Sequence, residues 1–223
     1  MNFLAFDLGA SSGRGILGIL KDGKLELQEI HRFPNGHKTV DGELFWDYPA
    51  LVNELKEGLK KALAITKDIA AIGVDTWGVD YVLFDKDTKA MKRLPYHYRD
   101  TRTEKYVDEI WNKVSRDEIY SRTGIQFMPF NTLYQLYAHK AEHPEDFENA
   151  QFLHMPDALA FALGGNFETE YTIANATFTT PGPETPTLIA HSGSPIPQKA
   201  PAINGLSSTA FAKTTSLAQP NPS

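Results

Sequence analysis

The apolar positions of the first half of the chain change from strand-like runs to a helical period. Apolar runs at residues 3–6, 13–20 and 25–30 predict three short strands. An Asp-Gly pair at 22–23 separates the second and third runs, and both residue types tolerate the positive φ of a hairpin turn. The pattern therefore predicts an antiparallel three-stranded meander over residues 1–32.

A helical period begins beyond the meander. Pro49 suits a first helical turn, and the apolar residues after it recur every three or four positions, which predicts an amphipathic helix over residues 48–66. Short apolar runs at 70–74 and 81–84 predict two further strands. Three more helices are expected at 103–113, 131–142 and 156–163. This order favours an α/β domain with a mixed sheet and flanking helices.

The composition changes near residue 180. Eight of the 14 prolines lie in residues 181–223, where Phe211 is the one aromatic residue. Such a segment buries too little apolar surface to offset the entropy lost on ordering it. We therefore predict one folded domain over residues 1–180 and a disordered low-complexity tail over 181–223.

Bulk properties exclude several classes of function. The chain has 223 residues, a formal net charge of -6 and no cysteine, so it forms neither disulfides nor thiolate metal sites. Its acidity disfavours broad nucleic-acid binding, which needs a basic surface. No apolar run reaches the roughly 18 residues of a membrane span. The N-terminus lacks the basic region of a secretory signal. These features favour a cytoplasmic enzyme that acts on small molecules.

The turn after the first strand holds the first group of candidate residues, Asp7-Leu8-Gly9-Ala10-Ser11-Ser12-Gly13-Arg14. Its glycines allow a ligand to approach the backbone, and successive N–H groups in such a turn can point at phosphate oxygens. Asp7 could hold Mg²⁺ through water, and Arg14 could place a positive charge near the phosphates. The turn leads into a strand, unlike a Walker loop or a dinucleotide fingerprint. The same residues also suit an ordinary hairpin.

A second group follows the strand at 70–74. Trp77 could present its ring to a sugar, and Gly78 lets a ligand reach the backbone. Asp75 and Asp80 could accept hydrogen bonds from sugar hydroxyls. The alternative is a structural turn, in which Trp77 packs in the core and an aspartate binds the turn backbone.

Several segments in sequence order resemble the FGGY carbohydrate kinases over residues 3–178. They are residues 7–14, 73–80, 98–103, 121–132, 155–157 and 170–172. Residues 121–136 are similar to the rhamnulokinase branch of that family.

The resemblance implies a ribonuclease-H-like domain of the actin and hexokinase type, the first of two that face a cleft. It also implies transfer of the γ-phosphoryl group of ATP to the 1-hydroxyl of L-rhamnulose, with Mg²⁺. In the family, the residues matching Ala10, Ser11, Ser12, Gly13 and Arg14 contact ATP. Asp7 matches the acid associated with metal, and Gly78 matches a sugar contact. Their place in the motifs adds Trp77, Asp75, Asp80 and Arg99 to the predicted sugar site.

The family's catalytic aspartate lies in a His-Asp-Thr-type motif at the start of the second domain. Here His191 is followed by Ser192 and Gly193. We therefore expect a truncated or frameshifted chain with little kinase activity alone, which self-associates through an exposed cleft face. Two other interpretations stay open. One is a different FGGY sugar kinase, such as a xylulokinase or fuculokinase, and the other is a non-catalytic sugar-binding remnant.

Three histidines are interpreted as structural. His139 and His143 have a spacing that suits metal binding, but a solvated helix face is favoured because no third ligand is evident. His97 could line the sugar site, and a structural role is favoured there too.

Overall fold

The computed structural model describes residues 1–170 and residue 173, so the predicted tail at 181–223 lies outside the described residues. The strands are β1 (Asn2–Leu8), β2 (Ser12–Lys21), β3 (Lys24–Pro34), β4 (His37–Val40), β5 (Glu43–Trp46), β6 (Ile69–Thr76), β7 (Tyr81–Asp85) and β8 (Ala150–His154). The helices are α1 (Tyr48–Ile65), α2 (Val107–Lys113), α3 (Arg116–Thr123), α4 (Thr132–Glu142) and α5 (Met155–Ala162), with 3₁₀ turns at Thr101–Tyr106 and Pro144–Phe147.

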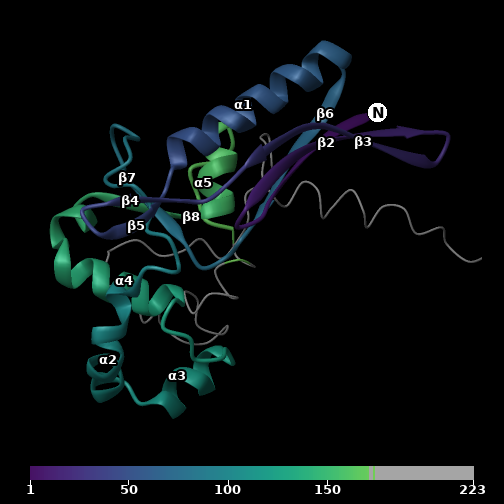
Figure 1. Cartoon of the computed structure of the whole chain (residues 1–223). Coiled ribbons are helices and arrows are strands. Elements are labelled where there is room, and N and C mark those ends of the chain that lie inside the picture. Colours follow the sequence, from purple (N-terminus) through teal and green to yellow (C-terminus); the bar gives the residue numbers. More distant parts are fainter. Residues whose placement is uncertain (171–172, 174–223) are drawn as a thin grey trace, which may run out of the picture.

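A four-stranded mixed sheet forms the upper part of the molecule (Figure 1). Its strand order is β3-β2-β1-β6, with β6 parallel to β1 and the other pairs antiparallel. Asp22 and Gly23 join β2 to β3 with φ values of 51° and 73°, as the Asp-Gly pair predicts. The predicted three-stranded meander is therefore confirmed.

Helix α1 packs on one face of this sheet. Alternate residues of β1, namely Leu4, Phe6 and Leu8, are buried in the main core together with Leu55 of the helix. A Cβ atom at Gly58 would lie 2.6 Å from the Phe6 ring, so the glycine lets the helix approach the strand closely. The helix also provides the long crossover that a parallel pair such as β1 and β6 requires.

The helices α2, α3 and α4 form a separate region below the sheet, with its own small core of Ile110, Ile119 and Tyr134 (Figure 1). The single helix predicted at 103–113 is in fact a 3₁₀ turn followed by α2. The sequence interpretation missed α3, although Ser115 caps its N-terminus and Gly124 ends it with a φ of 66°. Both residues are ordinary helix-boundary signals.

Two strand pairs lie outside the main sheet. Strand β7 confirms the strand predicted at 81–84, whereas β4, β5 and β8 were not predicted. The β4–β5 hairpin turns at Asp41-Gly42, whose φ values of 52° and 89° repeat the conformation of the first hairpin. The β7–β8 pair joins residues 81–85 to 150–154. The β4–β5 hairpin ends in Trp46, whose side chain is fully buried.

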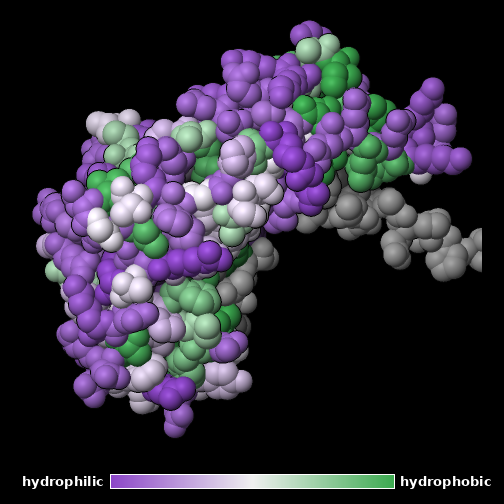
Figure 2. Space-filling view, in the orientation of Figure 1, coloured by the Kyte–Doolittle hydropathy of each residue, from purple (hydrophilic) through white to green (hydrophobic). Residues whose placement is uncertain are grey.

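Exposed leucines lie at the end of the sheet away from the β1–β2 turn. Leu25 and Leu27 of β3 are 58% and 65% exposed, and Leu20 of β2 is 40% exposed. Figure 2 shows hydrophobic surface on this arm of the molecule. In the part of the chain that the structure describes, no helix has the length and apolar character that a membrane span requires.

Candidate functional site

The strand register brings the two predicted groups of site residues together. Asp7 pairs with Asp75, and Leu8 pairs with Thr76, in the parallel ladder between β1 and β6. Both strands therefore end at the same edge of the sheet, where ligands of α/β proteins commonly bind. Trp77 follows that edge directly. The turn after β1 and the loop after β6 are accordingly neighbours in space.

Hydrogen bonds to Asn35 and within the turn fix the backbone of the turn after β1, while its tip is exposed to solvent. The N–H of Gly9 donates to the Ser12 carbonyl at 2.8 Å. The Asn35 side chain donates from Nδ2 to the Gly9 carbonyl at 2.7 Å, and the Asn35 N–H donates to the Ser11 carbonyl at 3.0 Å. Ala10 and Ser11 remain exposed at the tip, where a bound anion could reach them.

Asp7 and Arg14 lie opposite each other on β1 and β2 and form an ion pair. Arg14 donates from Nε and Nη2 to Oδ2 of Asp7 at 2.8 and 2.6 Å. The two side chains are 45% and 42% exposed, for Arg14 and Asp7 respectively. Ion pairs this exposed contribute little to stability. Arg14, which is expected to bind phosphates, and Asp7, which is expected to bind the metal, therefore neutralise each other in this structure. Both side chains remain accessible.

Gly13 differs from the rest of the turn because it is buried. A Cβ atom at this position would lie 2.2 Å from Cζ of Phe33. The missing side chain thus makes room for a core aromatic ring, which is a structural reason for the glycine that the sequence interpretation missed. The predicted contact of its backbone with ATP stays a prediction.

On the sugar side, Trp77 packs against the core rather than standing free. Its ring stacks on Trp46 with a centroid distance of 3.9 Å and an interplanar angle of 26°. The other side of Trp46 is occupied by His97, at 4.0 Å between centroids. One face of Trp77 is therefore covered, and the rest of this half-buried side chain remains for a ligand. Gly78, the next residue, is also half-buried.

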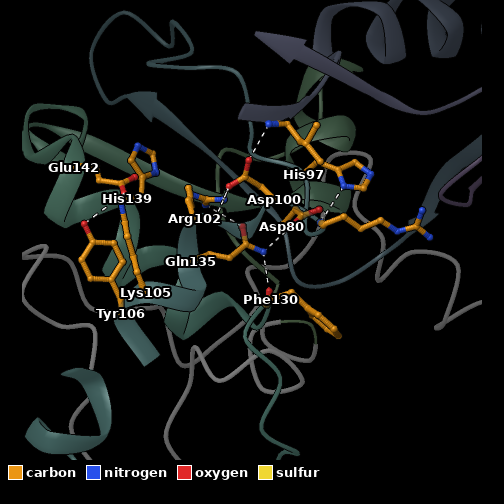
Figure 3. Close-up of polar contacts among 12 residues, drawn as sticks. Asp80, His97, Asp100, Arg102, Lys105, Tyr106, Phe130, Gln135, His139 and Glu142 are labelled. Atoms are coloured by element: carbon orange, nitrogen blue, oxygen red, sulfur yellow. Dashed lines mark hydrogen bonds and ion pairs between the residues drawn. The ribbon is translucent and has the colours of Figure 1, made fainter. Parts of the chain in front are cut away.

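Asp80 is fully buried at the far end of the same loop. Its Oδ2 accepts a hydrogen bond from Nε1 of Trp46 at 2.6 Å. Its Oδ1 accepts one from Nε2 of Gln135 at 2.7 Å (Figure 3). Burial raises the pKa of Asp80 to about 6, although hydrogen bonds from Gln135 and Trp46 act in the opposite direction. Both carboxylate oxygens are thus engaged inside the protein.

Arg99 and Asp75 are exposed, as contacts with a soluble ligand require. The guanidinium of Arg99 lies 5.5 Å from the ring centroid of Tyr98. Its backbone N–H donates to Nδ1 of His97 at 3.0 Å. Burial lowers the pKa of His97 to about 4, so this imidazole is neutral at pH 7. His97 therefore acts as a packing residue in this structure, as interpreted from the sequence.

His139 is buried, which corrects the expectation of a solvated face. Its Nδ1 lies 2.9 Å from the Tyr81 hydroxyl, and its Nε2 lies 3.0 Å from Oδ2 of Asp146. These contacts fit a neutral ring that accepts from Tyr81 and donates to Asp146. Among the described residues, no group of three or more His, Asp or Glu side chains is arranged to hold a metal ion.

Sequence reasoning missed two residues that shape the site, Trp46 and Gln135. The Asp41-Gly42 pair is a hairpin signal that could have indicated the strand carrying Trp46. Gln135 lies on α4, 55 residues from Asp80 in sequence, and no local pattern indicates that contact.

Comparison with known proteins identifies the family. The model of the FGGY family of carbohydrate kinases, N-terminal domain, matches residues 2–180. The chain belongs to the FGGY family of carbohydrate kinases. Rhamnulokinase of Bacteroides thetaiotaomicron is 47% identical over 175 residues, and that of Bacillus subtilis is 40% identical over 177 residues. These alignments cover 78% and 79% of this chain and 36% of each relative. The chain thus spans about a third of the length of these curated FGGY relatives.

Solved structures of FGGY kinases share the fold. Xylulose kinase from Lactobacillus acidophilus matches with a TM-score of 0.67 at 20% identity, covering 80% of this chain and 36% of that one. Glycerol kinase from Plasmodium falciparum, solved with ADP, matches with a TM-score of 0.66 at 22% identity, covering 81% and 38%. The expected α/β fold of the actin and hexokinase type, with a mixed sheet and flanking helices, is confirmed.

Proposed function

We propose that this chain supplies the phosphate-binding and sugar-binding loops of an ATP-dependent kinase whose substrate is L-rhamnulose. The observation that carries the proposal is the register of β1 with β6, which places the turn after Asp7 beside the loop that begins at Trp77. The choice of sugar rests on relatives named rhamnulokinase that are 40–47% identical to this chain.

In this proposal the turn after β1 binds the phosphates of ATP. Ala10, Ser11, Ser12 and Gly13 provide backbone N–H groups or hydroxyls, and Arg14 provides a positive charge. Arg14 would exchange Asp7 for a phosphate, which costs little because the ion pair is exposed.

The donor groups present fit a hydrated Mg²⁺ ion. Asp7 is an accessible carboxylate, and Asp75 lies beside it in the ladder, so both can accept hydrogen bonds from coordinated water. When bound, the ion neutralises charge on the phosphates. The pairing of β1 with β6 keeps the carboxylates of Asp7 and Asp75 at the strand ends, next to the turn after β1.

The loop after β6 binds the sugar in this proposal. Gly78 offers an approach to the backbone, and the uncovered part of Trp77 offers apolar surface for the sugar carbons. Arg99 and Asp75 are exposed polar groups that can bind its hydroxyls. These residues orient the substrate, which is the larger part of catalysis in phosphoryl transfer.

We further propose that the 223-residue polypeptide by itself binds the sugar with little or no turnover. The family resemblance implies a catalytic aspartate beyond the motifs of residues 7–172, and the side chain of Asp80 is fully buried, away from a substrate hydroxyl. A base must reach the sugar hydroxyl within hydrogen-bond distance.

Calorimetric titration with L-rhamnulose tests the first statement, that this chain binds the sugar. A coupled ADP-release assay tests the second statement, that the chain by itself shows little or no turnover. We expect saturable binding of L-rhamnulose that exceeds binding of D-xylulose, and ADP release close to that without sugar. Preference for D-xylulose would favour a different FGGY substrate. Turnover at the rate of an ordinary kinase would contradict the second statement, and absence of sugar binding would contradict the first.

A further inference from the structure

The carboxyl group of Asp80 closes a chain of buried polar contacts between the sugar loop and the helical region. Because its side chain has no exposed surface, it does not reach a ligand in this structure. It contacts Trp46 on one side and Gln135 on the other, at 2.6 and 2.7 Å. Trp46 in turn stacks on Trp77, the first residue of the sugar loop.

Gln135 connects Asp80 to the residues that precede α4 and to Arg102 (Figure 3). Its Nε2 donates to the Phe130 carbonyl at 2.8 Å and approaches the Val79 carbonyl at 3.4 Å. The same Val79 carbonyl accepts a shorter bond, of 2.7 Å, from the Thr132 hydroxyl. The end of the sugar loop is therefore attached to the start of α4 through both backbone and side chain.

The remaining contacts return to the β4–β5 hairpin. Oε1 of Gln135 accepts from Nη2 of Arg102 at 3.4 Å, and Nη1 of Arg102 lies 3.4 Å from Oδ1 of Asp100. Oδ2 of Asp100 accepts from the N–H of Leu44 at 2.8 Å. Leu44 and Trp46 both belong to β5, so the contacts form a closed ring around the base of the sugar loop. Every side chain in this ring is buried.

We propose that Asp80 is a positioning residue, which sets the shape of the Trp77-Gly78 loop through Gln135 and Trp46, and that it is not itself a sugar ligand. This inference rests on the proposed function for the identity of the ligand. A buried hydrogen bond that involves a charged group loses more when one partner is removed than an exposed one does. Loss of this carboxylate is therefore expected to displace Trp46, and with it Trp77, before any sugar is present.

The polarity of the Asp80–Gln135 contact provides a specific test. In Asp80→Asn, two amide groups meet and one donor loses its acceptor. In Gln135→Glu, two carboxyl groups meet and repel. In the double variant the amide and the carboxyl group exchange places, which restores the hydrogen bond between the two side chains and leaves the formal charge unchanged. The bond from residue 135 to the Phe130 carbonyl is lost in the double variant as it is in Gln135→Glu, so these two variants differ only at residue 80. Gln28→Glu, at an exposed position of β3, makes the same chemical change away from the ring.

Two measurements on the full 223-residue chain separate the proposal from its alternatives. Circular dichroism in a Trp111→Phe background reports the Trp46–Trp77 stack without ligand, because the chain has three tryptophans. Titration with L-rhamnulose reports sugar affinity. We expect Asp80→Asn to weaken the exciton signal and raise the dissociation constant about tenfold. We expect Gln135→Glu, which also loses the donor to the Phe130 carbonyl, to have the larger effect, and the double variant to bind L-rhamnulose about tenfold more tightly than Gln135→Glu.

The outcomes are distinct. An unchanged ligand-free signal in Asp80→Asn, with weaker sugar binding and no recovery in the double variant, would show Asp80 to be a direct ligand and overturn the inference. If Asp80→Asn does not fold, Gln135→Glu and the double variant still decide it through recovery or its absence. If the parent chain does not bind L-rhamnulose, the proposed substrate fails, while the dichroism series still supports or refutes the ring.

Discussion

The two loops of the candidate site are built in opposite ways. The turn after β1 exposes its charged and polar side chains, and Asp7 and Arg14 are each about half exposed. The loop after β6 rests on buried side chains, with Trp46 and Asp80 fully enclosed. In the turn after β1 the proposed ligand-binding groups contribute little to folding, whereas in the loop after β6 the supporting side chains are part of the core.

This difference bears on how each loop responds to a ligand. Exposed charges can exchange one partner for another at small cost, which suits a loop that must bind and release a nucleotide. A buried ring of hydrogen bonds holds one geometry, which suits a loop that orients a sugar. Substitution of the buried side chains that support the loop after β6 should therefore reduce stability, whereas substitution of the exposed charged side chains of the turn after β1 should change ligand affinity alone.

The largest effect is expected for Trp46→Ala on the sugar side. The substitution removes a fully buried indole and leaves Nε2 of Gln135 as the main donor to Asp80. Its cost to the free energy of unfolding should be about 3–5 kcal/mol, measured by urea denaturation. Trp46→Phe, which keeps the stacking surface and loses the donor, should cost less. Equal losses for the two variants would show that the hydrogen bond, rather than packing, dominates.

Gly13→Ala tests the one position of the phosphate turn that is buried. The new methyl group would meet the Phe33 ring at 2.2 Å, so the core must shift, at a cost of about 3 kcal/mol. Gly36→Ala is the matched control, because no atom lies within 4 Å of a Cβ there. A shift in the denaturation midpoint for Gly36→Ala as large as that for Gly13→Ala would indicate a general loss of backbone freedom instead of a clash.

His139 makes the stability of the helical side depend on pH. Burial lowers its pKa from 6.5 to about 4, so the unfolded chain takes up a proton at a higher pH than the folded one. The contribution of His139 to the free energy of unfolding is fully present above pH 6.5 and is lost as the pH falls toward 4. The pH dependence due to Asp80 has the opposite sign. Because its pKa is raised to about 6 in the folded chain, its contribution to the free energy of unfolding is lost as the pH rises toward 6.

We therefore expect His139→Gln to lose about 2 kcal/mol less stability than the parent between pH 7 and pH 5. Denaturation curves at the two pH values measure the difference. Parallel pH profiles for parent and variant would mean that the pKa of this histidine is the same in the folded and the unfolded chain.

The sequence predicts the local parts of this architecture and misses the long-range ones. The β1–β2–β3 meander and α1 follow from apolar period, an Asp-Gly turn and a helical proline, all within a few residues of one another. Local residue types also locate the turn after β1, and its contacts with phosphate stay a prediction. Asp80, by contrast, was interpreted as a candidate sugar contact because its partner Gln135 is distant in sequence and its burial depends on that packing. The packing reason for Gly13 is likewise not visible in the local sequence, because the Phe33 ring that contacts it comes from β3.

Arg14→Gln is expected to have the smallest effect on stability and sharpens the comparison most. Its exposed ion pair with Asp7 is screened by water, so the free energy of unfolding should change by no more than about 0.5 kcal/mol. If Arg14 binds phosphate as proposed, affinity for ATP in the presence of Mg²⁺ should fall about tenfold, and more salt should reduce the difference. Arg122→Gln is the control, because Arg122 pairs with Glu118 on α3, away from the turn after β1. A loss of ATP affinity shared equally by the two variants would indicate general charge attraction, whereas a loss confined to Arg14→Gln would place the phosphates at the turn.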